Sequence, residues 1–290
     1  MTPPPAASRP ATARERARAE LTREIKEEAR RQLTATGADG LSLRAVAKEL
    51  GMVSSALYRY YPSRDDLLTA LIIDAYNAVG EAAEQAVAGT VPAGDTVPTS
   101  DTAPTSDTVP TSDTAPTSDT VPTSDTVPAR ERWIGACRAV RDWARANPHE
   151  YALIYGSPVP GYRAPEATIG PAARVPLALV GVVQGALAAG ELTAAKETLP
   201  AAGTLAVQAS ALSVALSRSV ASPAGDHAFE AVPPDVLVRA VIAWTQLFGM
   251  ISFELFGQFV GSFEPADALF AHAVAQLAAF VGLRERAEGL

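Results

Sequence analysis

Residues 41–68 read LSLRAVAKELGMVSSALYRYYPSRDDLL, and this stretch decides the fold. Its leucine, valine and alanine residues recur at helical spacing until Gly51, which stands where a helix must end. Ser42 is predicted to cap the first helix. A second short helix is predicted over residues 54–61, because Pro62 disfavours helical geometry in the residue before it. The stretch therefore predicts two short helices joined by a tight turn, which is the geometry of a helix-turn-helix.

Helices are predicted on both sides of this unit. Residues 63–66 form a Ser-x-x-Asp capping box, which predicts a further helix from Asp65 to about Ala88. Before the unit, a helix over residues 16–36 is expected to pack across the two short helices and to close a three-helix unit. The apolar stripe of that first helix is formed by Leu21, Ile25, Ala29 and Leu33. The short second helix of such a unit fits the major groove of DNA.

A longer pattern runs through the same stretch, and its residues are Leu43-x-x-Val46-Ala47-x-x-Leu50-Gly51 and Leu57-Tyr58-x-Tyr60-Tyr61-x-Ser63-Arg64-x-x-Leu67. This pattern resembles the DNA-binding domain of the tetracycline-repressor (TetR) family. The resemblance implies an all-α protein in which a helix-turn-helix head is joined to a helical ligand-binding and dimerisation domain. A helical hairpin packed for structural reasons alone is the alternative, and the exposed Tyr-Arg-Tyr triplet at 58–60 argues against it.

The same resemblance implies which residues contact DNA. Tyrosine hydroxyls and arginine guanidinium groups donate to phosphate oxygens, and arginine also binds guanine with two hydrogen bonds. Val53 departs from the family pattern, which usually has Ser or Thr as the N-cap there. We therefore expect Ser54 to cap the helix one residue later, which would withhold its hydroxyl from the bases. The expected contacts are Tyr58, Tyr60 and Arg64 to phosphates, Arg44 near the groove edge, and Ser54, Ser55 and Arg59 to bases.

The charge of the chain is unevenly distributed. The formal net charge is −8, yet residues 9–66 hold 12 Lys and Arg against 9 Asp and Glu. A basic head on an acidic body suits a polyanionic partner at one end. We divide the chain into a disordered tail (1–14), a DNA-binding domain (15–66) and a helical regulatory and dimerisation domain (67–290). Two readings stay open for the arginines that surround the tail boundary: contacts to phosphate or the minor groove, or a solvated surface. These are Arg9, Arg14, Arg16 and Arg18.

Six consecutive hexapeptides fill residues 95–130, beginning with DTVPTS and ending with DTVPAR. Proline at every sixth position and few apolar side chains disfavour both a helix and a buried strand. Residues 90–130 are therefore predicted to be a disordered linker, formed by tandem expansion of a surface loop between two helices. A stacked β-helix is the alternative, but only Val or Ala recurs to fill its core.

The body is predicted to be helical, with order returning near Ala129. The last two helices, about 235–260 and 265–283, are apolar enough to need a second partner, and are expected to meet their copies as a four-helix homodimer interface. Segments 147–162 and 244–249 resemble the C-terminal domain of a TetR subgroup named for a Trp-His-Gly motif, with Phe248 in place of the His. Two further helices are predicted over 171–190 and 198–220.

Aromatic residues are concentrated in the body. They are candidates to line an apolar cavity between helices for a small-molecule effector of unknown identity. Packing in the core alone is the alternative for most of them. The candidate pocket residues are Trp133, Tyr151, Tyr155, Trp244 and Phe248.

Neither a catalytic site nor a metal or other cofactor is expected. The histidines at positions 149, 227 and 272 lack metal-ligand spacing, and no Gly-rich phosphate loop follows a strand. Cys137 is the single cysteine, which fits a reducing cytoplasm. Apolar stretches at 175–189 and 236–260 are too short or too interrupted by polar residues for membrane spans, and are predicted to be buried helices.

These features predict a cytoplasmic homodimer that binds a double-stranded DNA operator and acts as a repressor released by a small molecule. Two alternatives stay open. One is a DNA-binding dimer without an effector, whose body cavity would be filled by its own side chains. The other is a helical small-molecule-binding protein with a vestigial head, which an intact exposed set of Tyr58, Tyr60 and Arg64 disfavours.

Overall fold

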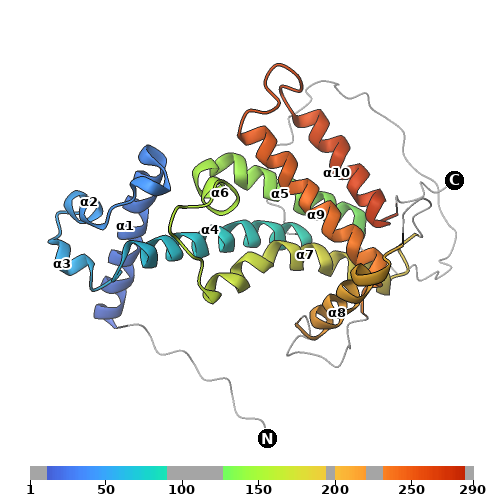
Figure 1. Cartoon of the computed structure of the whole chain (residues 1–290), viewed down its shortest axis with the longest axis horizontal. Coiled ribbons are helices and arrows are strands. Elements are labelled where there is room, and N and C mark those ends of the chain that lie inside the picture. The colour runs from blue at the N-terminus through green and yellow to red at the C-terminus, as the bar shows by residue number, and fades with distance from the viewer. Residues whose placement is uncertain (1–11, 90–126, 194–199, 220–230, 285–290) are drawn as a thin grey trace, which may run out of the picture.

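The computed structural model describes residues 12–89, 127–193, 200–219 and 231–284. These residues form an all-α protein, as predicted, with a small head at one end and a larger helical body (Figure 1). One long helix, α4 (Arg64–Val87), runs from the head into the body. The predicted tail up to residue 11 and the hexapeptide repeat up to residue 126 lie outside the described residues.

The head consists of α1 (Ala13–Thr36), the short 3₁₀ helix η1 (Ala38–Gly40), α2 (Leu43–Glu49), α3 (Ser54–Leu57) and the start of α4. Its core contains the predicted α1 stripe together with apolar residues of α2, α3 and α4. The two predicted caps are confirmed. Ser42 Oγ accepts from the Ala45 amide at 3.4 Å, and Ser63 Oγ accepts from the Asp66 amide at 3.1 Å.

Two boundaries in the head differ from the prediction. Helix α1 begins three residues early, because Thr12 and Glu15 form a reciprocal capping box before it. Helix α3 ends at Leu57 rather than at residue 61. A turn replaces the missing helical segment, with the Tyr60 amide bound to the Leu57 carbonyl at 2.8 Å.

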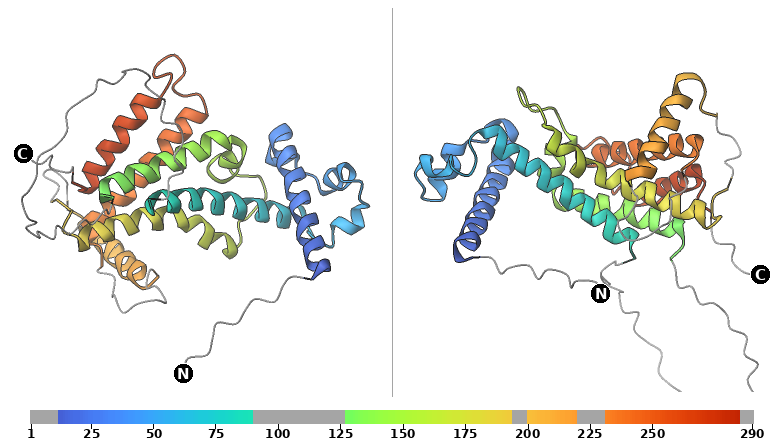
Figure 2. Two further views of the ribbon diagram at one scale, coloured as in Figure 1. Left: turned by 180° about the vertical axis from the view of Figure 1, so that it is seen from behind. Right: turned by 90° about the horizontal axis from the view of Figure 1, so that it is seen from below.

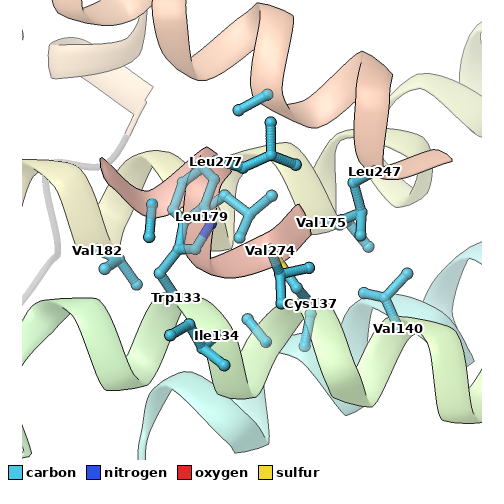
Figure 3. Close-up of a cluster of buried hydrophobic side chains, with 14 of the residues drawn as sticks. Trp133, Ile134, Cys137, Val140, Val175, Leu179, Val182, Leu247, Val274 and Leu277 are labelled. Carbon is cyan, nitrogen blue, oxygen red and sulfur yellow. The ribbon is translucent and has the colours of Figure 1, made fainter. Parts of the chain in front are cut away.

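The body contains α5 (Ala129–Ala146), α6 (Pro148–Tyr155), η2 (Glu166–Thr168), α7 (Ile169–Ala188), α8 (Gly203–Ser219), α9 (Pro234–Leu255) and α10 (Asp267–Val281). Helices α5, α7, α9 and α10 enclose one apolar core, part of which is drawn in Figure 3. Helix α8 packs against α9 at the end of the body away from the head, as Figures 1 and 2 show.

Helix α9 is shorter than predicted and ends at Leu255. Gly257, with φ of 76°, adopts the left-handed conformation that ends helices, and the chain continues in turns up to the start of α10. The segment that includes η2 and α7 (Glu166–Ala188) is longer than predicted. It and α9 are long and apolar enough to cross a membrane by length and composition. Both line the body core, but only 39% of each apolar stretch is buried, so the prediction of buried helices holds for one face of each.

Helix α4 belongs to two cores at once. Leu67, Leu68, Leu71 and Ile72 are buried in the head core, whereas Val79 and Ala83 are buried in the body core. Near its middle α4 crosses α7 so closely that a Cβ on Gly80 would lie 2.6 Å from Cβ of Arg174. The Arg174 guanidinium donates to the Asn77 carbonyl at 2.8 Å and to Glu84 Oε1 at 2.8 Å. Helix α4 is therefore one continuous element shared by the head and the body.

Candidate nucleic-acid interface

The turn between α2 and α3 places α3 at the outer edge of the head (Figure 1). Gly51 adopts φ of 65°, and the Met52 amide returns to the Ala47 carbonyl at 2.8 Å. Leu57 and Tyr61 are buried and anchor the far side of α3 and the turn after it. The outward side carries the predicted contact residues: Ser55, Tyr58 and Arg59 are exposed, and Ser54 and Tyr60 are half-buried.

The predicted capping role of Ser54 is wrong. Val53 is the N-cap of α3, in an extended conformation and without a side-chain hydrogen bond, and Ser54 is the first helical residue. The hydroxyl of Ser54 is therefore not used in capping. Val53 itself is 70% exposed beside it, at the leading tip of α3. Sequence reasoning treated Val53 as a defective cap and missed an exposed apolar side chain on the outward face, for which the departure from the Ser or Thr pattern was the signal.

The cations of the head fall into two groups. Within the described part of the chain, the side chains of one group make no hydrogen bond or ion pair: Arg14, Arg16, Arg18, Arg44, Lys48 and Arg59. The other group is neutralised by carboxylates. Arg23 pairs with Glu20 and Glu27, Arg31 with Glu28, Lys26 with Asp74, and Arg30 with both Asp74 and Glu150. The unpaired group includes residues of α2, of the turn after α3 and of the first turns of α1, and thus leaves positive charge for a partner outside the chain.

Arg64 has different partners from those expected of a phosphate contact. Its Nη2 donates to the Ala38 carbonyl at 2.6 Å and its Nε donates to the Leu41 carbonyl at 3.2 Å. The side chain is 31% exposed and lies 3.5 Å from Asp65. Arg64 therefore links the first turn of α4 to the segment between α1 and α2, which immediately precedes the helix-turn-helix.

The predicted pocket residues do not all lie together. Tyr155 and Trp244 line a pocket of about 690 Å³ between α4, α6, α7 and α9. Phe248 packs behind Tyr155, with ring centroids 4.2 Å apart, and Tyr151 lies 5.2 Å from Tyr155 by the same measure. Tyr151 is fully buried, where its hydroxyl donates to the Phe248 carbonyl at 3.1 Å. Tyr151 and Phe248 therefore form the packed layer behind the pocket wall.

Trp133 does not reach this pocket, which corrects the prediction for that residue. It is 1% exposed in the middle of the body core, among Leu179, Val182 and Leu277 (Figure 3). Residue type and position in α5 were compatible with either place, and only the packing of α10 over α5 decides between them. Trp244 differs, because its indole Nε1 is buried without a hydrogen-bond partner in the described residues while its ring contributes to the pocket wall.

The pocket is uncharged. Among the residues that the structure describes, its wall includes Tyr76, Tyr155 and Tyr162 but no Asp, Glu, Lys, Arg or His. Burial raises the pKa of Tyr155 and of Tyr76 above the usual value of 10.0, so both phenols stay neutral at physiological pH. No cluster of three potential metal ligands occurs in the ranges that the structure describes.

The pocket wall also touches the head. Leu153, Ile154, Val159 and Tyr162 line the pocket and pack against the head core. The Tyr162 hydroxyl lies 2.9 Å from Thr69 Oγ1 on α4, and the Arg30 guanidinium of α1 donates to Glu150 of α6 at 2.5 Å. Helix α6 and the segment after it thus connect the pocket to two helices of the head.

Two family models match this chain in the places that the geometry singles out. The model described as "Bacterial regulatory proteins, tetR family" matches residues 25–71, and "Tetracyclin repressor-like, C-terminal domain" matches residues 133–277. The HTH-type transcriptional regulator Rv1816 of Mycobacterium tuberculosis is 36% identical over 248 residues, which cover 84% of each chain. The chain belongs to the TetR family of transcriptional regulators. As predicted, it is a DNA-binding regulator of this family and not an enzyme.

Further relatives of this TetR-family protein agree with that assignment. The regulator Mb1846 of Mycobacterium bovis is also 36% identical, with 84% of each chain covered. The solved structure of the regulatory protein SCO4313 superimposes with a TM-score of 0.59 at 30% identity, and covers 92% of this chain and 100% of that one. A TetR-family regulator from Marinobacter aquaeolei VT8 shares the fold at 15% identity, with a TM-score of 0.50, 93% of this chain and 100% of that one.

Proposed function

We propose that this TetR-family regulator is a cytoplasmic homodimeric repressor that binds a near-palindromic operator and is released by an uncharged small molecule. The observation that supports operator binding best is the separation of charge in the head. Its paired cations serve the fold, whereas Arg44, Lys48 and Arg59 on α2 and the turn after α3 have no partner in the described chain. Such a surface suits the phosphates on both sides of a major groove.

Each head would insert α3 into one major groove. Ser54, Ser55 and Arg59 project from α3 and its following turn and are proposed to contact base edges, with Arg59 able to bind guanine through two hydrogen bonds. Tyr58 and Tyr60 are proposed to donate to phosphates on either side, and Arg44 to lie at the groove edge.

Two residues change roles in this proposal. The exposed Val53 suits apolar contact with a thymine methyl group. Arg64 is proposed to hold the helix-turn-helix in place rather than to contact phosphate, because its Nε and Nη2 already donate to two backbone carbonyls of the segment between α1 and α2.

The dimer is proposed to form through the outer faces of α9 and α10. An exposed stripe of apolar and small residues runs along α9, and a stripe of mainly alanine lies on the neighbouring α10. Stripes of this kind on two antiparallel helices suit a two-fold, four-helix interface. The residues are Val241, Ile242, Thr245, Gly249 and Phe253 of α9, and Ala268, Ala271, Ala275 and Ala279 of α10.

The effector is proposed to occupy the uncharged pocket beside Tyr155 and Trp244. Its wall of aliphatic and aromatic side chains suits an apolar molecule, since a charged group there would lose hydration without gaining a counter-ion. Because α6 and the segment after it contact both pocket and head, an occupant that displaces them would shift α4 and change the distance between the two heads.

Selection from random DNA duplexes with the purified full chain tests the proposal. We expect enrichment of two inverted half-sites, and two chains per duplex in analytical ultracentrifugation. Enrichment of one half-site bound by one chain would contradict the homodimer, and no enrichment by folded protein would contradict operator binding. The selected duplex then serves in a screen of uncharged apolar compounds, with a Trp244→Ala/Tyr155→Ala variant as the control. A compound that releases both proteins equally does not act through the pocket.

A further inference from the structure

A basic hollow lies between the first turns of α1 and the recognition segment, by which we mean α3 and the turn after it up to Tyr60. It has a volume of about 530 Å³. Three arginines and a tyrosine supply its polar groups: Arg14 and Arg18 from α1, and Arg59 and Tyr60 from the turn after α3. Its other described lining residues are Ala17, Leu21, Met52 and Ala56, so none of the described residues around the hollow supplies a carboxylate.

The position of the two α1 arginines is unusual for a helix that packs on protein. Leu21, Ile25, Ala29 and Leu33 follow one another at intervals of four on the face that enters the head core. Continued toward the N-terminus at helical spacing, the same face reaches Arg18 and then Arg14. The stripe therefore changes from apolar to cationic where α1 leaves the protein core, which indicates a polyanionic partner for its first two turns.

One arginine side chain of the hollow is held in place, and none of the three has a carboxylate partner in the described chain. The Arg18 guanidinium lies over the Tyr60 ring, 5.6 Å from its centroid, and this contact holds the side chain beside the recognition segment. The guanidinium groups of Arg14, Arg18 and Arg59 form no hydrogen bond or ion pair with any residue in the described part of the chain. Arg23, two turns further along α1, shows the contrasting case, because Glu20 and Glu27 neutralise it.

We propose that Arg14 and Arg18, together with Tyr60, form a site for backbone phosphates of the operator strand beside the groove that α3 enters, while Arg59, which lines the same hollow, keeps the base contact proposed above. Guanidinium groups suit phosphate oxygens, and the two on successive turns of α1 suit the closely spaced charges of a duplex. Arg14 and Arg18 precede residues 25–71, which the family's DNA-binding model matches. The site would therefore extend the interface beyond the helix-turn-helix of the family. This inference rests on the proposed operator binding, since it places α3 against DNA.

Single and double substitutions on α1 test the site. R14A and R18A each remove one charge at a position where alanine preserves the helix, and R23A removes the same charge from the same helix at a paired position. In titrations of the selected duplex between 50 and 200 mM salt, R14A and R18A should each lower the slope of log Kd against log salt by about one. Each phosphate contact contributes about 0.9 to the slope, so the double variant lowers the slope by about 1.8. If the affinities of the two proteins meet at about 1 M salt, the double variant should bind about sixtyfold more weakly than wild type at 0.1 M salt. R23A should keep the wild-type slope.

Ethylation interference locates the contacted phosphates. The wild-type protein should show interference at phosphates flanking each half-site that disappears in R14A/R18A, while interference within the half-site remains. Equal slopes for R14A, R18A and R23A, or an unchanged ethylation pattern, would overturn the inference. Loss of inorganic phosphate binding in R14A/R18A by calorimetry, with unchanged DNA binding, would overturn it as well and identify a small-anion site. Failure of the wild-type chain to select any duplex would instead contradict the proposed function.

Discussion

Arg59 in the head and Arg141 in the body are the same residue type in opposite surroundings. Arg59 is exposed, and its guanidinium makes no hydrogen bond or ion pair with a described residue. Arg141 is buried, with Nε and Nη2 on the two oxygens of Glu254 at 2.7 and 2.6 Å and Nη1 on Asp267 at 2.9 Å. A charge that is buried without a counter-ion destabilises the fold, so it must be paired. An exposed charge can stay unpaired without destabilising the fold, and it remains available to a partner. The difference separates arginines that hold this protein together from those left for a partner.

The largest effect is expected from Arg141→Ala. The substitution leaves the largely buried Glu254 carboxylate without its bidentate partner and unlinks α5 from α9 and α10. The free energy of unfolding should fall by about 3 kcal/mol, measured by urea denaturation. Arg145→Ala is the matched control, since Arg145 reaches the same two carboxylates from an exposed position, and it should cost under about 1 kcal/mol. Equal losses in the two variants would show that burial does not distinguish these arginines.

Arg59→Ala should have the opposite profile. Because Arg59 has no partner in the described chain, the free energy of unfolding should stay within about 0.5 kcal/mol of wild type. Operator binding should weaken by about 1–3 kcal/mol, measured by fluorescence anisotropy, with relaxed preference at one base pair. Substitution of the paired Arg23 by alanine controls for the lost charge. A stability loss in Arg59→Ala with unchanged DNA affinity would reverse the comparison.

Arg64→Ala sharpens the comparison inside the head. Loss of the hydrogen bonds to the Ala38 and Leu41 carbonyls should lower the free energy of unfolding by about 2 kcal/mol. The salt slope of the remaining operator binding should equal that of wild type, because no phosphate contact is removed. A slope lower by about one, with unchanged stability, would restore Arg64 to the phosphate contacts that the family resemblance implies.

The smallest effect concerns the thiol of Cys137, which is fully buried in the body core. Burial raises the pKa of this thiol from 9.0 to about 12. In the unfolded chain the thiol ionises above pH 9 while the folded thiol stays protonated, so its contribution to stability is lost as pH rises from 9 toward 12. At pH 10 the loss should be about 1 kcal/mol. The free energy of unfolding should fall more steeply with pH above pH 9 in the wild type than in Cys137→Ala. An identical pH dependence in the two proteins would contradict this prediction.

Local features were predictable from the sequence, and non-local ones were not. Ser42 and Ser63 cap their helices because a cap depends on residues three positions away. The partners of Arg64 are carbonyls 23 and 26 residues earlier, which no local pattern encodes. Trp133 and Trp244 show the same limit in the body. Both are helical tryptophans, and only the packing of distant helices puts one into the core and the other at the pocket wall.

The claim that the head's unpaired cations bind DNA has one most direct test. Gel shifts on the region upstream of the protein's own gene should be made with folded wild-type chain, with Arg44→Ala/Arg59→Ala, and with Arg23→Ala/Lys26→Ala, which removes two charges that carboxylates already neutralise. The account predicts a shift for the wild type and for the paired-cation variant, and loss of the shift for the unpaired-cation variant at the same salt concentration. Equal weakening of the two double variants, or no shift by folded wild-type protein at low salt, would contradict it.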